Sequence, residues 1–386
     1  MPRSDAGLGR QVLSTGFQIV ARGTEGRARR ALLSSARGRV ETPAFMPCAS
    51  RAVVRACSPD DLEAVGVEIA VANTWHLHLR PGEAAVEAAG GLHAFMSWGG
   101  LLATDSGGFQ AFSLARPADV SEDGVCLISP LDGSRALLTP EACVAIQEKL
   151  GADIAVALDI CTPYPVPYDV ARSAAERTLR WAQRCLQTHR REDQWLWGVI
   201  QGSIYPDLRA YSAQETAAMG FTGFGIGGLS VGESRREMLE VLETTIQALP
   251  AEAPKWVMGV GTPRDIVEAV LRGADLFDCV LPTRLARHGS LLTNHGPLKI
   301  GNAAFRTDPR PIEEGCDCPT CRRYSRAYLH HLFRLEEAAA WRLLSLHNLR
   351  WYVRLMERIR HAIRTATLGS LLSSLPPLTQ RDAQAC

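Results

Sequence analysis

The stretch TPRDIVEAVLRGADLFDCVL, residues 262–281, holds one helix and one strand of the fold that the sequence predicts. Thr262 followed by Pro263 is typical of a helix start, and Gly273 is typical of a helix end. The next residues, 275–281, form a short and nearly continuous apolar run, as in strands that are buried on both faces. The stretch therefore predicts a helix that leads directly into a buried strand.

Seven further apolar runs of similar length precede this strand, and helix patterns separate most of them. The runs are PAFMPCA (43–49), VEIAVAN (67–73), GLLATD (100–105), ADIAVALD (152–159), WLWGVIQ (195–201), FGIGGL (224–229) and KWVMGVG (255–261). Eight strands that alternate with helices predict a (β/α)8 TIM barrel of the α/β class, with a doubly wound open sheet as the rival. The long connection after the third strand, residues 106–151, includes VCLISPLDGSRALL, which predicts a hairpin about Asp132-Gly133.

Composition excludes several classes of protein. The chain has 386 residues, 46% of them apolar, and a net charge of +1, so bulk charge indicates no nucleic-acid partner and any RNA-binding charge must be local. The N-terminus lacks the apolar core of a secretory signal, and no run approaches the roughly 18 apolar residues of a membrane span. Eleven cysteines without a signal favour a reducing cytoplasm, where a tight cysteine cluster predicts a metal site.

The character of the sequence changes after residue 290, where a cysteine cluster is followed by a helical pattern. We expect residues 16–290 to form the catalytic barrel and residues 291–365 to form a zinc-binding subdomain with the C-terminal helices. Residues 1–15 and 366–386 are expected to be loose ends.

The cysteine cluster is the most specific local signal. It places three thiols within a segment of six residues. Three thiolates and one imidazole make a closed tetrahedral zinc site, which is structural because no coordination position is open for water. The candidate ligands are Cys316, Cys318 and Cys321, with His347 as the best fourth ligand and His330 and His331 as its rivals.

Polar or special residues stand at or near the carboxyl ends of most runs. They are Asn73, Asp105, Asp159, Gln201, the Gly227-Gly228 pair and Asp278. In a barrel these ends converge on the face that carries the active site, and buried carboxylates are costly unless they serve a site. Each residue alone could be a loop residue or a helix N-cap, but the set predicts a site. Asp275 is instead predicted to be solvated, and Cys279 should point away from Asp278 and pack.

Seven motifs connect the chain to a known family. In order they are DSGGFQ (105–110), ALDICTPYP (157–165), IQGS (200–203), IGGLSVGE (226–233), MGVGTP (258–263), FDCVLPTR (277–284) and CDCPTC (316–321) with a later histidine. These motifs resemble those of the tRNA-guanine transglycosylases, and the similarity extends over nearly the whole chain, from residue 16 to residue 364.

The resemblance implies a pentosyltransferase that exchanges the wobble guanine of tRNAs with a GUN anticodon for a 7-deazaguanine. It implies that Asp278 is the nucleophile and that Asp105 is the general acid/base. The other matched positions are Ser106, Phe109, Asp159, Cys161, Gln201, Gly228 and Met258 for the base, Arg284 and Arg287 for the anticodon-loop backbone, and Cys316, Cys318, Cys321 and His347 for one structural zinc ion per subunit.

These residue types suit that chemistry. Cleavage of a ribose–base bond passes through an oxocarbenium-like state that a carboxylate such as Asp278 can trap as an ester. A second carboxylate can protonate the leaving purine and deprotonate the incoming one. Asp159 can accept from the N–H groups of a guanine-like edge, whereas the Gln201 amide and the Gly228 N–H can donate to its carbonyl.

The resemblance also bears on the inserted base and on assembly. Cys161 and Val231 resemble bacterial enzymes that insert 7-aminomethyl-7-deazaguanine (preQ1) in queuosine biosynthesis, whereas the family's eukaryotic members insert queuine. Ile200 and Thr262 depart from a glutamine and a lysine that are frequent in the family. A cytoplasmic homodimer with its contact near residues 324–332 is expected. The alternatives are a queuine-inserting enzyme and a non-catalytic, zinc-containing tRNA-binding subunit.

Overall fold

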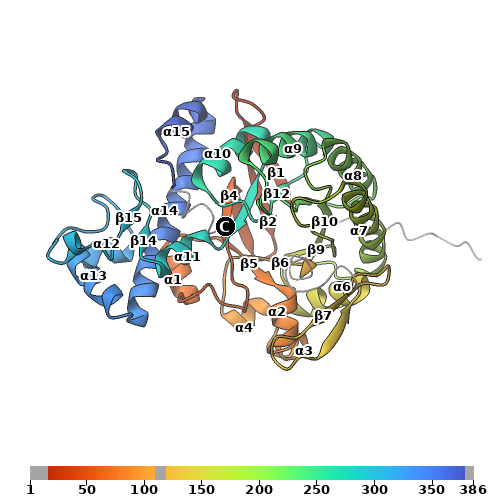
Figure 1. Cartoon of the computed structure of the whole chain (residues 1–386), viewed down its shortest axis with the longest axis horizontal. Helices are drawn as coiled ribbons and strands as arrows, with labels where there is room; N and C mark the ends of the chain where they lie inside the picture. Colours follow the sequence, from red (N-terminus) through yellow and green to blue (C-terminus); the bar gives the residue numbers. More distant parts are fainter. Residues whose placement is uncertain (1–15, 109–118, 379–386) are drawn as a thin grey trace, which may run out of the picture.

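The computed structural model describes residues 16–108 and 119–378, and its centre is a parallel barrel surrounded by helices (Figure 1). The barrel strands are β4 (Ala44–Pro47), β5 (Ile69–Asn73), β6 (Leu101–Asp105), β9 (Ile154–Val156), β10 (Trp195–Ile200), β11 (Phe224–Ile226), β12 (Lys255–Val257) and β13 (Leu276–Cys279). Their order around the sheet is β4-β13-β12-β11-β10-β9-β6-β5. A parallel bridge between Cys48 and Val71 brings the two edge strands together, so the barrel is nearly closed.

Each of these strands lies inside one of the eight predicted apolar runs, so the predicted barrel is confirmed and the open-sheet rival is wrong. The helices around the barrel are α1 (Pro59–Ala64), α2 (Thr74–Leu79), α3 (Glu83–Ala88), α4 (Leu92–Met96), α6 (Pro140–Leu150), α7 (Tyr168–Thr188), α8 (Pro206–Ala218), α9 (Arg235–Ala248), α10 (Pro263–Arg272) and α11 (Leu281–Arg287). The cap signals of α10 are also confirmed. The Thr262 side chain accepts from the Asp265 N–H, and Gly273 ends the helix with a left-handed φ of 104°.

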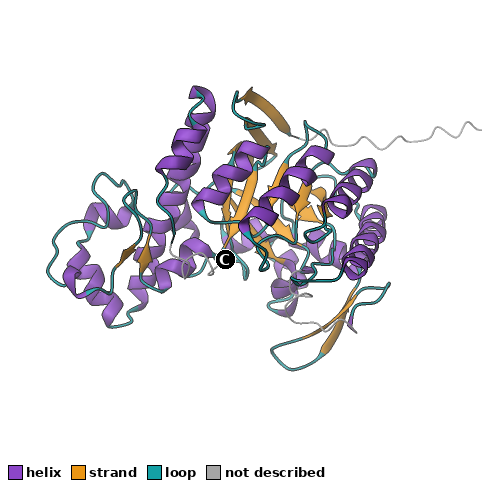
Figure 2. Cartoon of the chain, turned by 45° about the horizontal axis from the view of Figure 1, so that its top comes forward, coloured by secondary structure: helices purple, strands orange, loops and turns teal. Residues whose placement is uncertain are grey.

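The predicted hairpin is present as β7 (Val125–Ile128) and β8 (Arg135–Leu138), an antiparallel pair that projects beyond the helices (Figures 1 and 2). Its base is fastened to α7. The Trp181 indole N–H donates to the Glu122 carbonyl at 2.8 Å, and the Arg180 Nε–H donates to the Glu122 carboxylate at 2.7 Å. The hairpin is therefore fixed at its base on the outer side of the barrel.

A three-stranded antiparallel sheet, which was not predicted, precedes the barrel. It consists of β1 (Phe17–Arg22), β2 (Arg29–Ser35) and β3 (Gly38–Thr42). Its buried side chains, Phe17, Leu33 and Val40 among them, pack in one cluster with barrel-interior side chains such as Val71 and Trp256. The sheet therefore closes the amino-terminal end of the barrel.

The C-terminal part contains β14 (Ser290–Leu291), β15 (Leu298–Lys299), the short 3-10 helix η2 (Ala303–Phe305), α12 (Pro319–Arg323), α13 (Arg326–Arg334), α14 (Ala338–Thr365) and α15 (Leu368–Ser374). Helix α14 contacts α12 and α13 as well as β4 and β2 of the body. The expected loose tail is wrong for residues 366–378, because α15 buries Leu368 and Leu371. Residues 1–15 and 379–386 lie outside the described part.

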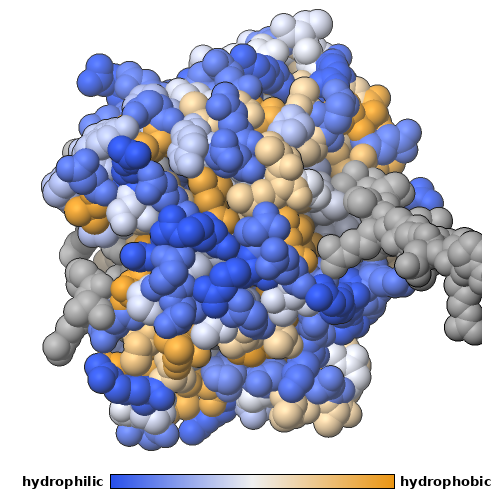
Figure 3. All heavy atoms as spheres, turned by 90° about the vertical axis from the view of Figure 1, so that its right-hand side faces the viewer, coloured by the Kyte–Doolittle hydropathy of each residue, from blue (hydrophilic) through white to orange (hydrophobic). Residues whose placement is uncertain are grey.

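The outer surface over the α7 and α8 side is predominantly hydrophilic, with apolar side chains in small groups (Figure 3). Tyr168, Val170 and Tyr211 are among its exposed apolar residues. Within the described residues, no helix combines the length and the apolar character that a membrane crossing requires.

Asp275 corrects one sequence expectation. It was predicted to be solvated, but its side chain is fully buried at the amino-terminal end of the barrel. The Arg29 guanidinium binds its carboxylate with two hydrogen bonds, Nε to Oδ1 at 2.8 Å and Nη2 to Oδ2 at 2.6 Å. The Lys255 backbone N–H donates to Oδ2 as well, at 2.8 Å. Asp275 therefore fastens the closing sheet to β12 and β13.

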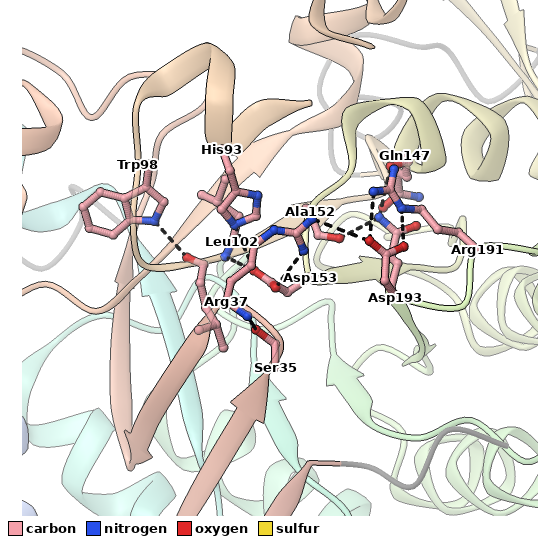
Figure 4. Close-up of polar contacts among 12 residues, drawn as sticks. Ser35, Arg37, His93, Trp98, Leu102, Gln147, Ala152, Asp153, Arg191 and Asp193 are labelled. Carbon is pink, nitrogen blue, oxygen red and sulfur yellow. Dashed lines mark hydrogen bonds and ion pairs between the residues drawn. The ribbon is translucent and has the colours of Figure 1, made fainter. Parts of the chain in front are cut away.

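Asp153 likewise fastens the β1–β3 sheet to the amino-terminal end of the barrel (Figure 4). It directly precedes β9 and is fully buried. Its carboxylate accepts from the Leu102 N–H at 2.8 Å, contacts the His93 imidazole at 3.1 Å and pairs with the Arg37 guanidinium at 3.3 Å. Burial raises the Asp153 pKa, but the His93 and Leu102 hydrogen bonds outweigh burial and leave the pKa below its usual value.

We expect Asp153→Asn to lower the free energy of unfolding by about 2–3 kcal/mol at pH 7, because it removes a charge that three donors bind. The Asp153 pKa is lower in the folded state, so its stabilisation is present above the unfolded pKa and lost as pH falls through the folded one. Urea denaturation over a pH series would measure both effects. The control Asp193→Asn removes an exposed carboxylate that pairs with Arg191, and it should lower the free energy of unfolding by less than about 1 kcal/mol. Equal losses of unfolding free energy in the two variants would contradict the assignment.

Candidate active site

The opposite end of the barrel gathers the polar residues that the sequence placed at strand ends. Asn73 and Asp105 are direct neighbours in the ladder between β5 and β6, and Asp278 lies beside Met46 in the ladder between β13 and β4. Asp105 and Asp278 are half-buried, whereas Asp159 and Gln201 are buried. Because parallel strands end on one face, this face carries the candidate site.

Among the described residues, Asp105 is held by neutral donors only. Its carboxylate accepts from the Asn73 side-chain amide at 2.7 Å, from the Thr74 N–H at 3.2 Å and from the Gly107 N–H at 3.3 Å. Burial raises the Asp105 pKa to about 7, and the negative charge of Asp278 also raises it, against the lowering effect of these hydrogen bonds. Asp105 can therefore exchange a proton near neutral pH.

Asp278 has one fixed and one available oxygen. The Trp256 indole N–H donates to Oδ1 at 2.8 Å, and the Gly259 N–H donates to the same oxygen at 3.0 Å. In the described part of the chain, Oδ2 has only a long contact, 3.8 Å, with the Cys48 thiol. Burial raises the Asp278 pKa, while the Gly259 and Trp256 hydrogen bonds lower it. A carboxylate oriented in this way can present Oδ2 as a nucleophile.

Asp159 lies at the centre of a buried hydrogen-bond group. The Ser106 hydroxyl donates to Oδ1 at 2.8 Å, and the Gln201 amide donates to Oδ2 at 2.7 Å. Burial is the main cause that raises the Asp159 pKa. Gly228 packs on Gln201, since a Cβ at Gly228 would lie 2.5 Å from Gln201 Oε1. The structure thus brings together Ser106 with the three positions, Asp159, Gln201 and Gly228, that the resemblance matched to the edge of a base.

The remaining base positions are distributed around this group. Cys161 is buried just beyond β9. Met258 follows β12 and is close to Gly225, where a Cβ would lie 3.0 Å from the Met258 sulfur. Phe109 lies outside the described residues.

Two arginines predicted to contact RNA stand on α11, which begins three residues after Asp278. Arg287 is half-buried, and its Nη1 is buried with no hydrogen-bond partner among the described residues. Burial lowers the Arg287 pKa, and the like charges of Arg55 and Arg284 lower it further. The structure therefore brings three guanidinium groups close to one another on and near α11, the helix that follows Asp278, which makes a local anion-attracting surface despite the +1 net charge.

The predicted metal ligands come together in the C-terminal part. Ligand atoms of Cys316, Cys318, Cys321 and His347 all lie within 4.8 Å of one another. The His347 Nδ1 lies 3.7 Å from the Cys316 and Cys318 sulfurs and 3.3 Å from the Cys321 sulfur. The His347 Nε2 lies 2.8 Å from the Leu292 carbonyl, which selects the tautomer that leaves Nδ1 available to a metal. The cluster can hold a metal ion.

His330 and His331, the rivals for the fourth place, do not belong to this cluster. The His330 Nδ1 instead bonds the Ile300 carbonyl at 2.8 Å.

Sequence reasoning missed the residues that hold the two central carboxylates. Trp256 and Cys48 stand inside apolar runs. The sequence of a run does not show which residue of the adjacent strand each side chain contacts. Asn73 was recognised as a strand end but not as the partner of Asp105. Only the strand register, which places β12 beside β13 and β5 beside β6, makes these contacts visible.

Comparisons with known proteins agree with this geometry. A family model described as queuine tRNA-ribosyltransferase matches residues 24–375. The chain is 48% identical over 356 residues to a queuine tRNA-ribosyltransferase of Halothermothrix orenii, covering 92% of this chain and 95% of that protein. It is 51% identical over 347 residues to one of Syntrophobacter fumaroxidans, covering 90% and 93%, and 49% identical over 354 residues to one of Symbiobacterium thermophilum, covering 92% and 88%.

We expect the purified chain to carry close to one metal ion, and Cys318→Ser to lose it, because the remaining three ligands cannot close the site. Elemental analysis together with the melting temperature would measure this. Cys57→Ser, a buried cysteine outside the cluster, is the matched control and should keep the ion. A Cys318→Ser variant with a full metal content would contradict the assignment.

Proposed function

The chain belongs to the queuine tRNA-ribosyltransferase family, and from this premise we propose that it exchanges the wobble guanine of GUN-anticodon tRNAs for preQ1. It is a pentosyltransferase of the tRNA-guanine transglycosylase type. The observation that carries the proposal is the pair of carboxylates, Asp105 and Asp278, at the carboxyl ends of β6 and β13 on the same face of the barrel. Each is held by neutral donors and neither by a cation among the described residues.

The first half of the proposed reaction replaces a base by the enzyme. Asp278 Oδ2 attacks the C1′ carbon of the target nucleotide, the C1′–N9 bond breaks, and an ester joins the ribose to the protein. Protonated Asp105 gives its proton to the departing guanine. Trp256 and Gly259 keep Oδ1 out of the reaction and aim Oδ2.

The second half runs in the opposite direction with a new base. The incoming base loses its N9 proton to ionised Asp105, N9 attacks C1′, and Asp278 leaves as a carboxylate. No phosphate bond breaks, and the two inversions restore the original configuration at C1′. A pKa of about 7 suits Asp105 to both protonation states.

Base recognition is assigned to the buried group around Asp159. Its carboxylate accepts from the N–H groups of a guanine-like edge, while the Gln201 amide and the Gly228 N–H donate to the base carbonyl. Cys161 and Val231 support preQ1 as the inserted base. Ile200, where the family often has glutamine, is fully buried and offers no polar side chain.

The partner is tRNA, whose target base must leave its stack to reach Asp278. Arg284, Arg287 and Arg55 are assigned to the phosphates beside that base. The metal ion is assigned as zinc, because three thiolates and one imidazole are its preferred structural ligands. Bound zinc would fasten the C-terminal subdomain and take no part in the chemistry.

A cytoplasmic homodimer completes the proposal. In the predicted contact segment the Tyr324 and Tyr328 rings stack with centroids 5.5 Å apart, and Tyr328 is 45% exposed. A stacked aromatic pair with one exposed ring suits a subunit contact, and light scattering would test it. The described cysteines are free thiols, which suits a reducing compartment.

We expect the wild-type chain to exchange labelled guanine into a tRNA with a GUN anticodon. Asp278→Asn should lower the exchange by about a thousandfold or more and abolish the covalent protein–RNA adduct, because an amide is a poor nucleophile. Asp275→Asn, which lies directly before the same strand at the far end of the barrel, should keep the adduct per folded molecule. An undiminished adduct in Asp278→Asn would move the nucleophile elsewhere.

The same assay decides between the alternatives. Competition of preQ1, queuine and guanine for incorporation should favour preQ1, whereas a preference for queuine would select the queuine-inserting alternative. A wild-type chain that binds tRNA but exchanges no base would be the non-catalytic subunit.

The pH dependence of adduct formation should report on Asp105. Its acid form is required in the first half, so the single-turnover rate should fall as pH rises through about 7. Asn73→Ser removes the amide that stabilises the carboxylate but keeps an acceptor for the α2 N-terminus, so it should move this fall to higher pH. His76→Gln is the control for a nearby imidazole; if it removes the pH dependence, the titrating group is not Asp105.

A further inference from the structure

Arg209 is a buried cation in the first turn of α8 that the proposed reaction does not use. Its side chain is fully buried, and no carboxylate of the described residues forms an ion pair with it. Burial lowers the Arg209 pKa to about 10, so the guanidinium still carries its charge at neutral pH. A buried charge without a counter-ion is costly, so other groups must compensate it by hydrogen bonds.

The partners are backbone carbonyls of two loops. Arg209 donates from Nε to the Ser203 carbonyl at 2.7 Å and from Nη1 to the Ile200 carbonyl at 3.3 Å. It donates from Nη1 to the Gly227 carbonyl at 2.7 Å and from Nη2 to the Gly228 carbonyl at 3.0 Å. The first two carbonyls flank Gln201 beyond β10, and the other two belong to the glycine pair beyond β11. One side chain thus joins both loops that face the base.

These contacts fix the direction of two N–H groups. In a trans peptide the carbonyl and the next N–H point in opposite directions. When the Gly227 carbonyl points to Arg209, the Gly228 N–H points away from it, and the Gly228 carbonyl fixes the Leu229 N–H in the same way. Gly228 has a left-handed φ of 65°, so its loop depends on contacts that select this conformation.

The backbone that follows Gln201 is constrained in the same way. Gly202 has a φ of 142° and Ser203 a φ of 52°, both in the left-handed region. A Cβ at Gly202 would lie 2.9 Å from the Arg209 N atom, so the loop is packed directly on α8. The Arg209 guanidinium bonds the carbonyls on both sides of this turn and holds the Gln201 side chain at the level of Asp159.

We propose that Arg209 is a positioning residue for base recognition, which orients the Gly228 N–H and the Gln201 amide toward a carbonyl of the base. The inference rests on the proposed function. It assigns to Arg209 the selection of purine-type bases that carry a 6-oxo group over those that lack it. Arg209 itself does not touch the base; it acts through the two loops that it joins.

The test compares the inhibition constants of two bases against guanine exchange. Guanine carries the 6-oxo group, and 2-aminopurine lacks it. Wild type should bind guanine far more tightly, because a site built for a polar group rejects the analogue that lacks it. Arg209→Met should reduce this ratio by about tenfold or more, with the KM for tRNA unchanged. Arg209→Lys, which keeps the charge but not the fork, should reduce it less.

Arg29→Met is the matched control. Arg29 is a buried arginine at the other end of the barrel, so this variant should lose stability and keep the ratio. Should Arg209→Met fail to fold, Arg209→Lys and Arg209→Gln carry the measurement. A ratio within about twofold of wild type in folded Arg209→Met or Arg209→Gln overturns the inference, since a purely structural role would weaken both bases alike. A wild type that exchanges no guanine is instead a failure of the proposed function.

Discussion

Every buried carboxylate in this barrel needs a partner, and the two ends of the barrel meet that need in opposite ways. At the amino-terminal end, Asp275 pairs with Arg29 and Asp153 pairs with Arg37. At the carboxyl end, Asp105, Asp159 and Asp278 accept only from amides, a hydroxyl, an indole and backbone N–H groups of the described residues, with a long thiol contact at Asp278. A cation stabilises ionisation more strongly than a neutral donor does. At the amino-terminal end hydrogen bonds hold the pKa of Asp153 below its usual value, whereas at the carboxyl end burial raises the pKa of Asp105, Asp159 and Asp278.

The neutral partners of Asp159 also explain why Arg209, a buried cation close to the proposed base site, bonds carbonyls and not a carboxylate. Had Arg209 paired with Asp159, the carboxylate would have been saturated and unable to receive the N–H groups of a base. Arg209 instead bonds four backbone carbonyls of the surrounding loops. Its charge is compensated by dipoles, and Asp159 keeps neutral partners that a ligand can replace or supplement.

Much of this fold could be predicted from the sequence, because the decisive patterns are local. Buried parallel strands leave continuous apolar runs, caps mark α10, and three close thiols mark the metal cluster. The β1–β3 sheet escaped prediction because its strands alternate buried and exposed side chains and so leave no continuous apolar run like those of the barrel strands. The prediction that Asp275 is solvated was wrong, because the sequence around a carboxylate beside a strand does not show whether its partner is water or a distant arginine such as Arg29. Trp256 needed the register of β12 against β13 before it could be seen as the partner of Asp278.

The metal cluster is connected to the reaction site through α14 and α11. His347 is followed by Asn348, which is buried and donates to the carbonyls of Pro282 and Ser290, both at 3.0 Å. Pro282 lies in the first turn of α11, the helix that carries Arg284 and Arg287. One turn further along α14, the Tyr352 hydroxyl donates to the Gly261 carbonyl at 2.5 Å, in the loop after β12. A metal bound at His347 would therefore also hold in place α11, the helix proposed to contact RNA.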